Sequence, residues 1–277
     1  MDNSIRKDEA RIVIRPAKEP ENSARPIPAE VFQRAFNTFF EALKTANSEI
    51  NSEKSKSEFF IAHLKIGSNE VGIFEQRRSG TQSLSPAIDY FEQMLGSVYR
   101  SDFSSAVESP KMAQRIINFG KAIKPEYPGV VAFPRQSIPL DEFFVEQTKR
   151  LAQAIGAPPI ERKYFAGSTI GAFDGTIGNI DYRGAVWRGH LVLPGGGAQI
   201  ECVFDRRRGE DEFNPHGNKR VSITGRAIYT GDGPLPERIE VIEIEDIPLA
   251  IEPTDIRGSL SGAQYRVGWR RDGKNFQ

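Results

Sequence analysis

The sequence predicts an α+β protein in which a helical α+β domain precedes a small antiparallel β-barrel. Two observations lead to this prediction. Apolar residues recur at helical spacing in several segments up to about residue 155. After the chain-breaking run Gly156-Ala157-Pro158-Pro159 the period changes to two, and five β-like segments follow one another. We therefore expect a flexible arm at 1–28, an α+β domain at 29–156, a barrel at 160–248 and a basic tail at 249–277.

The first strong helix is expected from Pro28 to Ile50, where seven apolar residues form one stripe: Val31, Phe32, Ala35, Phe36, Phe39, Phe40 and Leu43. A hairpin over 59–66 and 71–76 follows, with a turn at Gly67-Ser68-Asn69. Three later helical patterns cover 86–98, 110–123 and 139–155, and an extended stretch covers 127–134. A short alternating piece, residues 11–15, is expected as an edge strand of this domain.

The five β-like segments are expected at 164–181, 187–193, 200–204, 220–229 and 238–244. The first is long and rich in glycine, which permits a strand to bend around a barrel. The apolar alternation of the last slips between Val241 and Ile242, which indicates a bulge. Three strands, a connection of about a dozen residues and a final hairpin resemble an OB-fold, a five-stranded Greek-key barrel. Another small antiparallel barrel or sandwich is the alternative.

The resemblance implies a binding face on the second and third strands. Six residues are expected to point outward there: Arg188, His190, Val192, Gln199, Glu201 and Val203. This face has no aromatic side chain for base stacking, and it carries a carboxylate. Residues 161–247 contain 11 Lys/Arg and 14 Asp/Glu, a net charge of 11 − 14 = −3. If the barrel does bind nucleic acid, the candidate residues are Arg188, His190, Arg206, Arg207, Arg208, Lys219 and Arg220.

The composition gives no sign of a metal, a cofactor or a membrane span. Lys+Arg and Asp+Glu are both 37 in the 277 residues, so no global basic field is expected. The single Cys202 excludes an internal disulfide and fits a reduced, cytoplasmic compartment. Cys202 is expected to be buried and inert, and the three histidines lack metal-site spacing. Asp174, Asp181 and Glu201 are the carboxylates that a metal-dependent nuclease would use, but nothing else in the sequence supports that reaction.

The C-terminal tail differs in charge from the barrel. Residues 257–277 hold five Lys/Arg and one Asp, a net charge of 5 − 1 = +4, and Tyr265 and Trp269 are interleaved with the charged residues. These residue types are enriched in protein interfaces, so we expect partner binding or self-association through Tyr265, Arg266, Trp269, Arg270 and Arg271. The alternative is a tail that folds back on the acidic barrel. The function expected overall is that of a non-enzymatic binding or adaptor protein; the alternatives are a nucleic-acid-binding accessory factor, antitoxin-like or part of phage defence, and a nuclease.

Trp269→Ala should weaken partner binding or self-association more than Lys274→Ala does. A buried Trp anchor costs more than about 2 kcal/mol when truncated, whereas an exposed lysine contributes under about 1 kcal/mol. Analytical ultracentrifugation and thermal melting of the two variants check this. A fall of many degrees in the melting temperature of Trp269→Ala, with association intact, would place the tail in the protein's own core.

Overall fold

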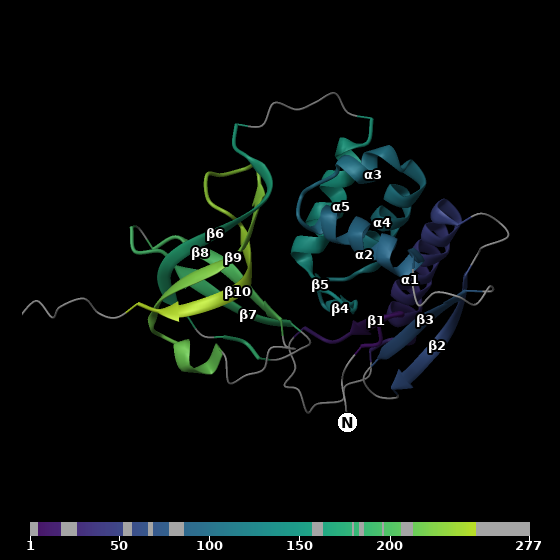
Figure 1. Cartoon of the computed structure of the whole chain (residues 1–277), viewed down its shortest axis with the longest axis horizontal. Coiled ribbons are helices and arrows are strands. Elements are labelled where there is room, and N and C mark those ends of the chain that lie inside the picture. The colour runs from purple at the N-terminus through teal and green to yellow at the C-terminus, as the bar shows by residue number, and fades with distance from the viewer. Residues whose placement is uncertain are drawn as a thin grey trace, which may run out of the picture.

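The structure, a computed structural model, describes residues 5–17, 27–51, 57–65, 69–77, 86–156, 163–178, 180–182, 186–195, 197–205 and 213–247. The fold is α+β: a helical domain with its own sheet lies beside a closed five-stranded barrel (Figure 1). No helix within those ranges is both long and apolar enough to cross a bilayer.

The sheet of the first domain has five antiparallel strands in the order β2-β3-β1-β4-β5. Their bounds are β1 Glu9–Ile14, β2 Ser57–Lys65, β3 Glu70–Arg77, β4 Gly129–Ala132 and β5 Ser137–Leu140. The prediction of an edge strand near residues 11–15 was wrong, because β1 pairs with β3 on one side and β4 on the other. Side chains on both faces of β1 are buried. Ala10, Ile12 and Ile14 lie in the core beneath the helices, whereas Val13 lies in a separate cluster of four valines.

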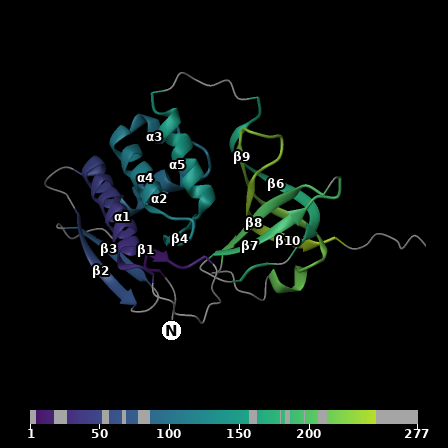
Figure 2. The same ribbon diagram turned by 180° about the vertical axis from the view of Figure 1, so that it is seen from behind.

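The helices cover one face of this sheet, as the two opposite views show (Figures 1 and 2). They are α1 Ala29–Ile50, α2 Pro86–Tyr99, α3 Ser104–Glu108, α4 Pro110–Ala122 and α5 Glu142–Ala154. The predicted stripe of α1 supplies Phe39, which is fully buried and packs its ring against Phe91 of α2 and Phe119 of α4. Buried Glu75 of β3 accepts hydrogen bonds from the first amides of α2, at Ala87 and Ile88.

The barrel closes in the order β10-β8-β7-β6-β9. Its strands are β6 Ala166–Ile177, β7 Val186–Val192, β8 Gln199–Asp205, β9 Arg220–Thr230 and β10 Arg238–Asp246. The prediction of a purely antiparallel barrel was wrong, since β8 and β10 are parallel. Strand direction cannot alternate all the way around a ring of five, so closure requires one parallel pair. The topology-level likeness to an OB-fold agrees with this closed, mixed barrel.

The barrel core is built from the inward residues that the alternation predicts, with Trp187, Phe204 and Ile223 among them. Burial raises the pKa of the Cys202 thiol to about 12, so the thiol stays protonated at neutral pH. The predicted bulge is confirmed by a register shift between Val241 and Glu243. A Cβ at Gly225 would meet the carbonyl oxygen of Glu240 at 2.5 Å, which explains glycine where β9 and β10 approach closely.

Candidate protein-interaction site

The two domains meet at Arg238 of β10, whose side chain is only 2% exposed. Its Nη1 donates to the Tyr99 hydroxyl at 2.5 Å and its Nη2 to Asp141 Oδ2 at 2.9 Å, both in the helical domain. Its Nε donates to Glu201 of the barrel at 2.6 Å. The guanidinium carbon also lies 4.2 Å from the ring centre of Phe143. A buried cation thus joins groups from both domains, and its donors are matched by acceptors.

Charge complementarity sets the ionisation of this cluster. Burial alone would raise the pKa of Asp141, but Arg238 and Arg188 outweigh it and hold that pKa below its ordinary value. Burial raises the pKa of Tyr99, which keeps its hydroxyl neutral. Burial alone would lower the pKa of Arg238, yet the facing Tyr99, Asp141 and Glu201 raise it. At neutral pH the cluster therefore holds a charged arginine and ionised Asp141.

The helical domain covers the face on which an OB-fold would bind its ligand. Val186 of β7 and Val203 of β8 form a small buried cluster with Val13 and Val130 of the five-stranded sheet. Beside it, Arg188 of β7 makes an ion pair of 2.9 Å with Asp141. Of the six residues predicted to point outward, Arg188, Glu201 and Val203 therefore contact the helical domain. This face is occupied within the chain itself.

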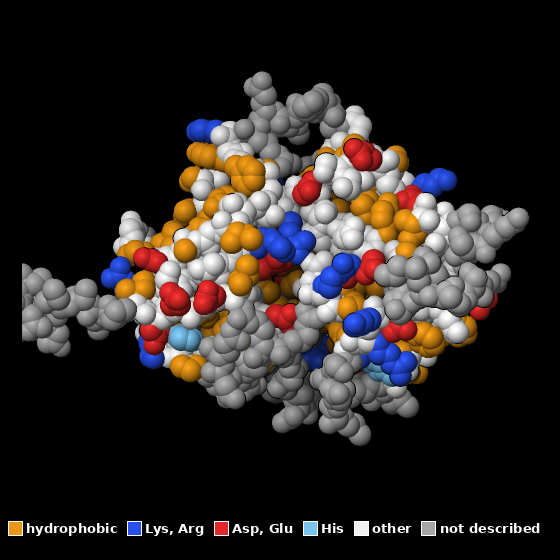
Figure 3. Space-filling model, viewed as in Figure 1, with side chains coloured by type: hydrophobic (Ala, Val, Ile, Leu, Met, Phe, Trp, Pro, Cys, Tyr) orange, Lys and Arg blue, Asp and Glu red, His pale blue; other side chains and the backbone are white. Residues whose placement is uncertain are grey.

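A cleft of about 490 Å³ lies beside the junction, lined by both domains. Acidic and basic side chains gather along this boundary (Figure 3). Arg100 of α2 and Arg226 of β9 share the carboxylate of Glu240, at 3.3 and 3.0 Å. Arg135 binds buried Glu92 at 3.3 Å, and burial raises the pKa of Glu92 despite this contact. Arg100, Arg135 and Arg226 thus form ion pairs with carboxylates that line the cleft. We therefore regard the cleft as part of the contact between the domains and not as a ligand site.

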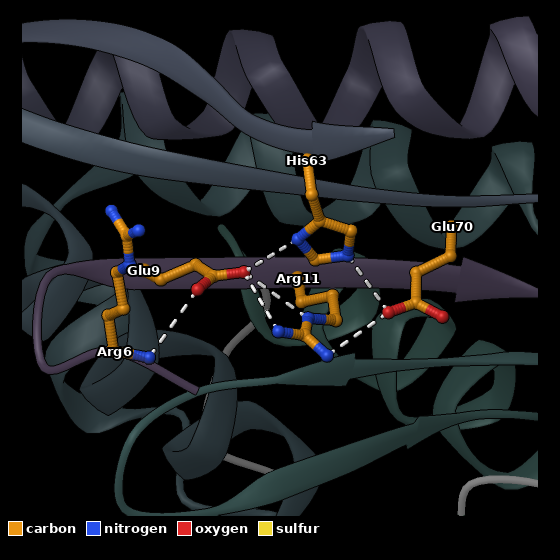
Figure 4. A network of polar contacts seen from close by, with 5 residues as sticks. All are labelled: Arg6, Glu9, Arg11, His63 and Glu70. Atoms are coloured by element: carbon orange, nitrogen blue, oxygen red, sulfur yellow. Dashed lines mark hydrogen bonds and ion pairs between the residues drawn. The ribbon is translucent and has the colours of Figure 1, made fainter. Parts of the chain in front are cut away.

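A second polar cluster lies on the sheet face that the helices leave uncovered (Figure 4). His63 Nδ1 is 3.2 Å from Glu9, and His63 Nε2 is 3.0 Å from Glu70. Arg11 lies 3.1 Å from each of the same two carboxylates. Gly72 makes room, because a Cβ there would lie 2.4 Å from Glu9 and 2.6 Å from His63.

This cluster is a closed ring of ion pairs in which both ring nitrogens of His63 face a carboxylate. The Arg11 guanidinium bridges the two carboxylates, where a metal ion would have to bind. Within the described residues, no group of three or more His, Cys, Asp or Glu is arranged to hold a metal ion.

Two strand edges expose large apolar side chains. On β2, which pairs only with β3 in the described sheet, Ile61 is 64% exposed and Leu64 is 62% exposed. On β6, Ile170 is 65% exposed. In the described chain, β6 pairs with β7 only at Thr176 and Ile177. Residues 166–175 of β6 therefore form strand hydrogen bonds on one side, with β9. Such edges offer unpaired backbone groups next to apolar surface, which suits the addition of a partner's strand.

The remaining predicted residues do not gather at one place. Lys219 is bound by Asp246 at 3.1 Å, whereas Arg188 is bound by Asp141 at the domain junction. His190 and Arg220 are exposed. The other predicted residues, Arg206, Arg207, Arg208 and the tail residues Tyr265, Arg266, Trp269, Arg270 and Arg271, lie outside the described residues. Arg238, Asp141 and Tyr99 were not predicted from the sequence, because a local pattern shows only one side of a contact between distant segments.

No family model matches the chain, and no curated protein matches it either.

Arg238→Ala should lower the free energy of unfolding by about 3–5 kcal/mol, because it leaves the Tyr99 hydroxyl and Glu201 without their buried cation and leaves Asp141 with Arg188 alone. Arg226→Ala is the matched control: it removes an arginine from the same boundary, but that side chain is 37% exposed and should cost under about 1 kcal/mol. Urea denaturation of both variants measures the difference. Equal, small losses would show that the buried junction contributes little.

The stability of the junction should depend on acid pH. The folded-state pKa of Asp141 lies below its ordinary 3.8, so its contribution is fully present above that value and is lost as the pH falls through the lower folded-state pKa. Asp141→Asn keeps an acceptor for the Phe144 amide at the start of α5 but removes the charge. The stability gap between wild type and Asp141→Asn should therefore be constant near neutral pH and narrow below about pH 4. Urea midpoints across this range test it; a gap that widens in acid would contradict the assignment.

Proposed function

We propose that the protein is a non-enzymatic adaptor that joins protein partners at strand edges held in fixed geometry by the Arg238 junction. The observation that carries the proposal is the pair of exposed apolar edges, β2 and the first half of β6, one on each domain. Because the two domains are joined by buried contacts, partners at the two edges would be held at a defined distance and orientation.

The chemistry of the β6 edge favours a protein partner. Strand addition supplies backbone hydrogen bonds, and apolar side chains beside the edge supply specificity. Ile170 is accompanied on this edge by small residues, Ser168, Thr169 and Ala172, which are also exposed. Phe165 lies just before the strand, is 58% exposed and packs its ring edge-on against Tyr229. An extended segment could approach such a strand without steric hindrance from bulky neighbours.

The occupied barrel face weighs against the nucleic-acid alternative. A single-stranded nucleic acid on an OB-fold would need the face of β7 and β8, which here contacts Val13, Val130 and Asp141. Arg188 lies on that face and points to the junction, where Asp141 neutralises its charge. No observation favours the nuclease alternative, in which Glu201 would be a metal ligand, since Glu201 is bound by Arg238.

Ile170→Lys should reduce capture of protein partners from the native host by about tenfold or more, because a charge replaces the exposed apolar anchor of the edge. Affinity purification of the full chain with quantitative mass spectrometry measures this. Val107→Lys is the matched control, since Val107 is 44% exposed but lies on α3, away from both edges.

Partners retained equally by Ile170→Lys and Val107→Lys would contradict docking at β6. Titration of the purified chain with single-stranded oligonucleotides provides the second measurement. Tight binding that weakens steeply with salt would favour the nucleic-acid alternative instead.

A further inference from the structure

No further inference is drawn: the strongest candidate, the apolar surface patch that Phe60, Ile61 and Leu64 form at the edge of β2, already belongs to the docking edges proposed above, and nothing in the described part of the chain shows what covers it.

Discussion

The buried guanidinium of Arg238 is the constraint on which the relation between the two domains depends. A charge with 2% exposure is tolerated only where acceptors surround it, and here they come from Tyr99 and Asp141 on one domain and Glu201 on the other. Neither domain alone supplies enough acceptors. Because the guanidinium is planar and its donors are fixed, it also fixes orientation, in a way that apolar packing between Val13, Val130 and the barrel valines would not.

This junction changes what the barrel's topology implies. A closed barrel of this order is compatible with many functions, and a site has to be argued from its residues. Here the face formed by β7 and β8 contacts the helical domain, so a further ligand must bind another part of the surface. In the described residues, β2 and the first half of β6 are strand edges where apolar side chains are exposed, which is why we propose protein contacts rather than nucleic-acid binding.

Much of the architecture could be predicted from the sequence, because most elements carry a strong local period. The stripe of α1, the five barrel strands and the bulge after Val241 all follow from such patterns. The central position of β1 could not be predicted, since a six-residue strand used on both faces looks like any short alternating piece. β5 was missed because Pro139 interrupts its pattern. The role of Arg238 was not predicted because its acceptors Tyr99 and Asp141 lie 139 and 97 residues away in the sequence.

The bulge in β2 has two opposed physical effects. Bulges usually protect an edge, because the extra residue disrupts the ladder and increases the twist. Here the extra residue, Ala62, also brings Phe60 and His63 onto one face, and Gly72 beneath them lets His63 and Glu9 close their ion pair. The ion pairs of His63 with Glu9 and Glu70, which Arg11 also binds, then link the bulged strand to β1 and β3 by side-chain contacts.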